Sequence, residues 1–149
     1  MVTTVGTEST IEGLLEDLIA LDYDAADAYQ AAIDRIEDSR CKARLAEFKG
    51  DHLRHVEELG GILSGMGRTP PSGGDMKSIL TTGKVVMAGL VGDKAILQAM
   101  RTNEADTNTA YERAINFDAL TSTTRDTLQR GLQDERRHCE WILETLQTL

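Results

Sequence analysis

The sequence contains little of what builds a β-sheet or a disulfide framework. Aromatic residues make up 4% of its 149 residues, and it has two prolines and two cysteines. Residues that favour helices, such as Ala, Leu, Glu and Arg, are abundant instead. Because a chain of this length buries roughly 70% of its unfolded surface, we predict one all-α domain over residues 1–149, with residues 1–8 as a flexible N-terminus.

Positive charge is also scarce. The chain has 16 Lys and Arg against 25 Asp and Glu, which gives a formal charge of −9. This sign repels phosphate backbones and anionic lipid, so we expect neither nucleic acid nor a membrane as a partner. No stretch approaches the roughly 18 apolar residues of a spanning helix, and the first residues lack the basic and apolar regions of a signal peptide. The expected location is the cytoplasm.

The two cysteines, Cys41 and Cys139, are too few for a disulfide framework and lack the spacing of a zinc site. We expect both to be reduced thiols. A disulfide, or a ligand role for Cys139 beside His138, is the alternative.

Four long segments carry apolar residues at helical spacing. They run from about Ser9 to Glu37, from Ser39 to about Met66, from about Asp93 to Phe117, and from Ser122 or Thr123 to about Leu149. Glycines and two prolines end the second segment, and residues 75–92 are expected to hold a short helix that leads into the third. This order predicts an antiparallel four-helix bundle with one long crossover.

Six polar residues lie on the apolar faces of these segments, and their spacing repeats. From Asp22 to His52 is 30 residues and from Glu104 to Glu135 is 31, and a histidine follows three positions later in each half. A tyrosine also follows the first carboxylate of each half by seven residues. The repeat places the six residues at one depth of the bundle: Asp22, His52, His55, Glu104, Glu135 and His138.

This set of side chains is typical of a metal site. Residues three apart are neighbours on one helix face, so Glu135 and His138 can bind one ion from one helix, and His52 and His55 can do so from another. Asp22 and Glu104 then complete the set from the remaining helices. Carboxylate and imidazole together suit iron, manganese or zinc, whereas calcium prefers oxygen alone.

The alternative is that each residue is an ordinary core or boundary residue, as a single one usually is. For the whole set this is unfavourable, because unpaired buried carboxylates are costly against a total stability of about 5–15 kcal/mol. Tyr29 and Tyr111 either pack in the core or donate hydrogen bonds to the ligand carboxylates. The sequence leaves both roles open.

With these residues the chain resembles the ferritin-like superfamily, which includes ferritins, bacterioferritins and rubrerythrins. Its site has one Glu from each of two helices and a Glu-x-x-His from each of the other two. Glu104, with Glu135-Arg136-Arg137-His138, matches this pattern. The layout over residues 9–149 is most similar to small, uncharacterised bacterial bundles of the superfamily, on the Leu15-Glu16-Asp17-Leu18-Ile19 opening.

The first half departs from the pattern at two positions. Asp22 replaces the usual Glu, and His52 replaces the carboxylate that bridges two ions in the family. A neutral imidazole offers one lone pair and cannot bridge, so Glu135 is expected to be the sole bridge. Three carboxylates then face two divalent ions, which predicts a weaker second ion unless Asp51, Glu58 or a hydroxide contributes. Asp51 is a weak candidate, because it lies about 100° around the helix from His52.

The resemblance implies iron as the cofactor, as two ions or as one ion with a weaker second position, with manganese or zinc as alternatives. It also implies dioxygen or peroxide as reactants in a ferroxidase-like or peroxidase-like reaction. The competing hypothesis is a non-enzymatic metal-binding or stress-related bundle with a degenerate site. A homodimer is the expected protein partner.

Overall fold

Four long helices form the bundle in the computed structural model, which describes residues 3–73 and 89–149. They are α1 (Ile11–Arg35), α2 (Ser39–Gly65), α4 (Asp93–Ile115) and α5 (Ser122–Thr148). The described residues contain no strand, so the all-α four-helix prediction is confirmed. The short helix predicted in the crossover falls almost wholly in residues 74–88, outside the described residues. Among the described helices, none is long and apolar enough to cross a membrane.

Side-chain caps set where three of the helices begin. The Thr10 side chain accepts a hydrogen bond from the Gly13 amide, and Asp38 accepts bonds from the Arg40 and Cys41 amides of α2. Thr121 caps α5 in the same way. Each oxygen satisfies an amide that has no partner within the helix. The helices therefore begin within two residues of the predicted positions, while α1 and α4 end two residues earlier than predicted.

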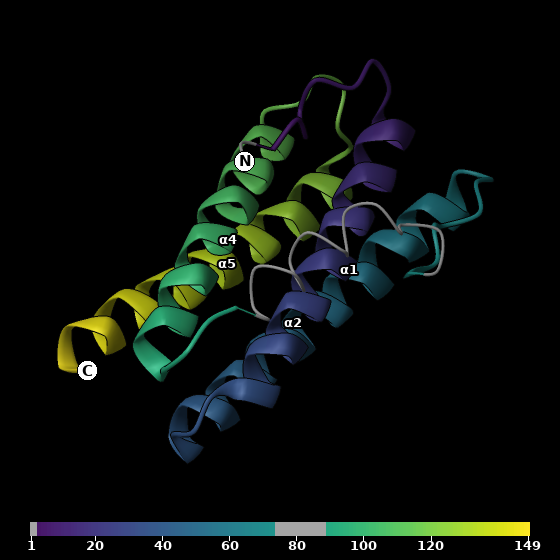
Figure 1. The fold of residues 1–149 in the computed structure, drawn as a ribbon. Helices are drawn as coiled ribbons and strands as arrows, with labels where there is room; N and C mark the ends of the chain where they lie inside the picture. Colours follow the sequence, from purple (N-terminus) through teal and green to yellow (C-terminus); the bar gives the residue numbers. More distant parts are fainter. Residues whose placement is uncertain (1–2, 74–88) are drawn as a thin grey trace.

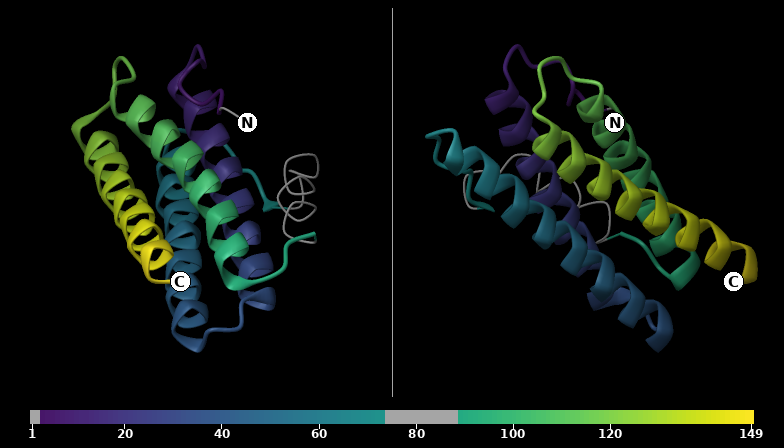
Figure 2. Two further views of the ribbon diagram at one scale, coloured as in Figure 1. Left: turned by 60° about the vertical axis from the view of Figure 1, so that its left-hand side comes forward. Right: turned by 180° about the vertical axis from the view of Figure 1, so that it is seen from behind.

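The four helices lie side by side, and each neighbouring pair is antiparallel (Figures 1 and 2). α1 packs mainly against α2 and α4, and α5 packs against α4 and α2. The turn between α1 and α2 is tied to the start of α4, because the amides of Glu37 and Asp38 donate to the Asp93 carboxylate at 2.8 and 2.9 Å. The first and second halves of the chain thus share one bundle interior.

The interior has two apolar clusters, one toward each end of the bundle. One contains Tyr29, Leu45 and Phe48, and the other contains Leu15, Leu59 and Leu132. On every helix the predicted metal ligands fall between residues of the two clusters. The fold therefore holds a polar layer at mid-height, with apolar packing above and below it.

The start of the described chain lies against the bundle. Val5 is buried within the second apolar cluster, and the Arg113 guanidinium donates to the Thr3 carbonyl at 2.8 Å. Thr3 and Val5, which the sequence places in a flexible N-terminus, thus have specific contacts with α4.

Candidate metal centre

The six predicted ligands lie together in the polar layer. Each of the four helices contributes, and none of the six residues is more than 3% exposed. Such burial of three carboxylates and three imidazoles is unusual without partners of opposite charge. The residues are Asp22 on α1, His52 and His55 on α2, Glu104 on α4, and Glu135 and His138 on α5.

These residues form two overlapping groups, in each of which one ligand atom per residue lies within 4.8 Å of the others. The first group is Asp22, His52, His55 and Glu135, and the second is His52, Glu104, Glu135 and His138. Each group contains oxygen and nitrogen donors and can hold a metal ion. His52 and Glu135 belong to both groups, so the two positions are adjacent.

Several ligand atoms have no hydrogen-bond partner among the described residues. They are Nε2 of His52, Nδ1 of His138 and both carboxylate oxygens of Glu135. Buried polar atoms are normally satisfied, and leaving one unpaired costs about 1–3 kcal/mol. A cation bonded to these atoms would satisfy all of them at once, so the donor set fits a bound metal.

Two tyrosines hold the Asp22 and Glu104 carboxylates in place by hydrogen bonds across the bundle. The Tyr111 hydroxyl on α4 donates to Oδ2 of Asp22 on α1 at 2.6 Å. Tyr29 on α1 donates in return to Oε1 of Glu104 on α4. Both rings are fully buried. The tyrosines thus have both roles that the sequence leaves open: they pack in the core, and they donate hydrogen bonds to predicted ligands.

Two aspartates orient the histidines in the same reciprocal way. Nε2 of His138 on α5 donates to Asp51 on α2 at 2.8 Å, and Nε2 of His55 on α2 donates to Asp134 on α5 at 2.9 Å. The Nδ1 atoms of both rings consequently face the ligand carboxylates. This is the carboxylate–histidine pairing that fixes ring orientation in metal sites.

Neither aspartate role follows from helical periodicity alone. Asp51 is a weak ligand candidate in the sequence and is in fact a partner of His138, while Asp134 is not singled out at all. A signal exists in the chain, because each aspartate directly precedes the first ligand of its helix, at Asp51-His52 and Asp134-Glu135.

Two arginines cover the aspartates toward solvent. Arg137 donates to Asp51 at 2.7 Å, and Arg54 donates to Asp134. The arginine side chains are about half exposed, at 50% and 46%. Arg54 also donates to Asp51 and Arg137 to Asp134, so the four residues form one charged network between α2 and α5, on the solvent side of His55 and His138.

The carboxylates of the centre differ in their affinity for protons. Burial raises the pKa of Glu135 to about 7, despite the attraction of the His52 ring. Burial also acts against ionisation of Asp22 and Glu104, but the neighbouring histidines outweigh it and hold both pKa values below their ordinary range. Of the three carboxylates, Glu135 is thus the one whose ionised form gains most from an additional positive charge beside it.

The histidines have the opposite shift. Burial lowers their pKa values, but the surrounding carboxylates outweigh it, so the pKa of His55 rises to about 12. The pKa values of His52 and His138 rise as well. The metal-free centre therefore holds protons on nitrogens whose lone pairs a metal needs, and metal binding must release them.

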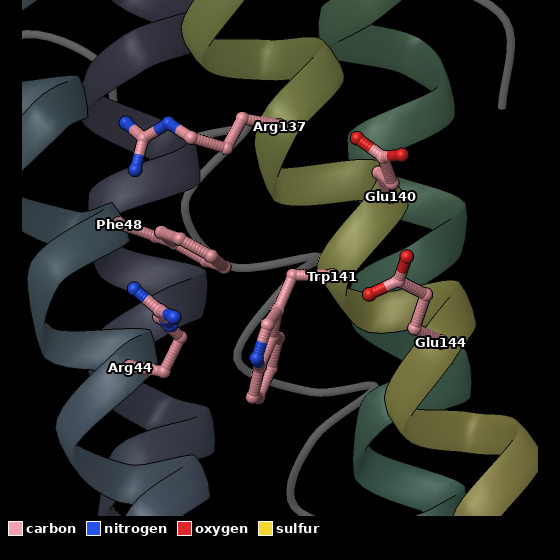
Figure 3. A pocket seen from close by; sticks show the side chains of 6 residues that line it. All are labelled: Arg44, Phe48, Arg137, Glu140, Trp141 and Glu144. Atoms are coloured by element: carbon pink, nitrogen blue, oxygen red, sulfur yellow. The ribbon is translucent and has the colours of Figure 1, made fainter.

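A surface pocket of about 280 Å³ lies beside the centre, between α2 and α5 (Figure 3). Its wall includes Phe48, whose ring stacks on the His138 ring with 4.2 Å between centroids. Trp141, the single tryptophan of the chain, packs edge-on against Phe48 at 5.6 Å. One aromatic ring thus separates this pocket from a candidate ligand.

Both cysteines are free thiols, as the sequence predicts. Cys41 packs in an apolar cluster. Neither cysteine belongs to either ligand group, so the alternative ligand role for Cys139 finds no support in the geometry.

A family model described as "Domain of unknown function (DUF2383)" matches residues 10–117. The chain belongs to this family. The DUF2383 match includes α1, α2 and α4 with four of the six candidate ligands, and α5 with Glu135 and His138 lies beyond it. No curated protein and no solved structure matches the chain.

Proposed function

We propose that this chain is a ferritin-like protein that binds a first-row transition metal, iron foremost, as two ions or as one ion with a weaker second position, and uses it in oxygen- or peroxide-linked redox chemistry. The carrying observation is the pair of buried ligand groups that share His52 and Glu135, with four candidate ligand atoms that have no hydrogen-bond partner among the described residues. Each ion would have oxygen and nitrogen donors from at least three helices.

The donor chemistry supports iron or manganese, with zinc as a further candidate. Three carboxylates and three imidazoles suit these ions, whereas calcium takes oxygen ligands only and copper(I) prefers sulfur. Redox-active ions supply the electron transfer. The chain fixes the positions of the candidate ligands. Tyr29 and Tyr111 donate hydrogen bonds to the Glu104 and Asp22 carboxylates. Asp51 and Asp134 accept hydrogen bonds from the His138 and His55 rings.

The burial of the site favours a small reactant. All six candidate ligands are at most 3% exposed, so an organic substrate could not reach the ions without displacing packed side chains. Dioxygen and hydrogen peroxide, as small molecules, need the least displacement of packed side chains. The same burial also favours the alternative function, a non-enzymatic protein that retains metal as a sensor or buffer.

Metal analysis tests the binding step. Protein purified without chelator and reconstituted anaerobically with ferrous or manganous ion should contain at least one ion per chain. Glu135→Ala removes a member of both groups and should abolish binding, whereas Glu112→Ala, an exposed carboxylate on α4, should leave the stoichiometry unchanged. Equal metal content in the two variants, or none in the parent protein, would contradict the proposal.

A second measurement separates the redox function from the non-enzymatic alternative. After loading with ferrous ion, dioxygen or peroxide is admitted and iron oxidation is followed by absorbance. The parent protein should oxidise iron faster than Glu135→Ala under the same conditions. Full metal content with no faster oxidation would favour a sensor or buffer.

A further inference from the structure

The ring of His52 lies between the two ligand groups and presents a different nitrogen to each. Nδ1 is 2.8 Å from Oδ1 of Asp22, which belongs only to the first group. Nε2 is 3.5 Å from Oε1 of Glu104, which belongs only to the second. The ring is fully buried, and its Nε2 has no hydrogen-bond partner among the described residues.

This geometry changes what the histidine can do. A neutral imidazole has one lone pair and binds one ion. When its remaining N–H bond breaks and the proton leaves to solvent, the anionic ring has a lone pair on each nitrogen and can bond an ion at either end. No electron is transferred, and the second metal–nitrogen bond replaces the N–H bond. A nearby cation promotes such proton loss, as it does for metal-bound water and thiols.

The charge of the site favours the same arrangement. Asp22, Glu104 and Glu135 carry −3 against the +4 of two divalent ions, whereas the family pattern supplies four carboxylates. An anionic His52 ring brings the ligand charge to −4. Uncompensated charge is costly in a fully buried site, so a neutral set of ligands and ions is favoured.

We propose that His52 bridges two divalent ions, with Nδ1 bonded to the ion held by Asp22 and His55 and Nε2 bonded to the ion held by Glu104 and His138. The inference rests on the proposed metal-binding function. It predicts a wide separation of roughly 6 Å, since two metal–nitrogen bonds of about 2.1 Å add to the width of the ring. Carboxylate-bridged or hydroxide-bridged pairs lie only about 3.5–4 Å apart.

Glu135 defines the competing arrangement. Its Oε1 faces Nδ1 of His55 at 3.5 Å and its Oε2 faces Nδ1 of His138 at 3.8 Å, so its carboxylate can also reach toward both sides. If Glu135 sets the separation, the ions are close and His52 serves only one of them. The distance between the two ions therefore distinguishes the two arrangements.

X-ray absorption at the iron edge measures this distance. The full chain is loaded anaerobically with two equivalents of ferrous ion, and the stoichiometry is checked by metal analysis. We expect two ions per chain, outer-shell scattering from imidazole, and no iron scatterer within about 4 Å. In His52→Glu a carboxylate takes the bridging position, so an iron scatterer at about 3.5–4 Å should appear.

A second variant keeps the test independent of how well His52→Glu folds. His52→Gln retains a neutral side chain of similar reach that cannot bridge as an anion, and it should bind at most one ion. His55→Gln removes a ligand from one position only and serves as the matched control: it should weaken one ion and create no short iron–iron distance. Circular dichroism of each variant verifies that the bundle is intact.

The outcomes separate the two proposals. A short iron–iron distance in the parent protein, a single bound ion, or two ions retained by His52→Gln would overturn the bridge and leave the metal-binding function standing. Absence of metal from the parent protein and from His52→Glu alike would overturn the metal-binding function itself.

Discussion

Asp51 on α2 accepts a hydrogen bond of 2.8 Å from Nε2 of His138 on α5, so α2 orients a candidate ligand of α5. The bond directs Nδ1 of His138 toward Glu104 and makes the ring a better donor to a metal. We expect Asp51→Asn to lower metal affinity about 10- to 100-fold, the usual effect of losing such a partner. Ferrous titration followed by quenching of Trp141 fluorescence measures it.

Asp134→Asn and Asp126→Asn provide the controls for this experiment. Asp134 orients His55 and should give a loss of similar size, at the other ion position. Asp126 is exposed on α5 and should have no effect. Equal affinities for Asp51→Asn and Asp126→Asn would show that His138 is not a ligand or needs no orientation.

The sequence predicts the helices and the position of the six candidate ligands because both depend on local spacing. Apolar residues at three and four positions define each helix, and the same period places Asp22, His52 and Glu104 on buried faces. The structure brings the six residues together as the repeat predicts. The repeat predicts that the six residues lie at one depth along the bundle, because equivalent residues of the two halves are separated by nearly equal lengths of chain.

The partners of the ligands depend on how helices are rotated against each other, which no single-helix pattern contains. Asp51 lies about 100° from His52 around α2. It therefore does not share the direction of the His52 side chain and instead faces α5. The hydrogen bonds of Tyr29 and Tyr111 likewise cross from α1 to α4 and back. Such contacts become visible only once the neighbours of each helix are known.

Gly131 on α5 lies where Tyr111 approaches the helix backbone most closely. A Cβ at this position would lie 3.0 Å from Cδ1 of Tyr111 and closer still to Cε1. We expect Gly131→Ala to destabilise the protein by about 1–3 kcal/mol, as overpacking usually does, and to weaken metal binding by displacing the tyrosine from Asp22. Chemical unfolding with chelator measures the first effect.

Gly50 in α2 is the matched control, because a Cβ there meets nothing within 4 Å. Gly50→Ala should raise the free energy of unfolding by up to about 1 kcal/mol, through higher helix propensity alone. Destabilisation by both substitutions would indicate that the close approach of Tyr111 is not the cause.

The Tyr111 hydroxyl is a buried donor to Asp22, and its removal leaves a carboxylate oxygen without that bond. Tyr111→Phe should lower the stability of the metal-free protein by about 1–3 kcal/mol. Tyr23→Phe, at a partly exposed position on α1, should change it little. Thermal unfolding with chelator compares the two, and equal melting temperatures would argue against a role for this hydrogen bond.

The raised pKa values of His55 and Glu135 predict different pH dependences for the stability of the metal-free and the metal-loaded protein. The ordinary pKa of His is 6.5, and that of His55 in the fold is about 12. For Glu135 the ordinary value of 4.5 rises to about 7. Between the two values of each group the folded state holds a proton that the unfolded state has released.

The metal-free protein should therefore lose stability as the pH rises from about 5 to about 9. The His55 contribution is fully present below pH 6.5 and decreases above it, and the cost of ionising Glu135 grows between pH 4.5 and about 7. A metal competes with these protons, so its stabilising effect should increase over the same range. Melting temperatures with chelator and with manganous ion, measured at half-unit intervals from pH 5.5 to 8.5, should diverge as the pH rises. Parallel curves would mean that metal binding releases no protons from this centre, and that the histidines and Glu135 do not bind it.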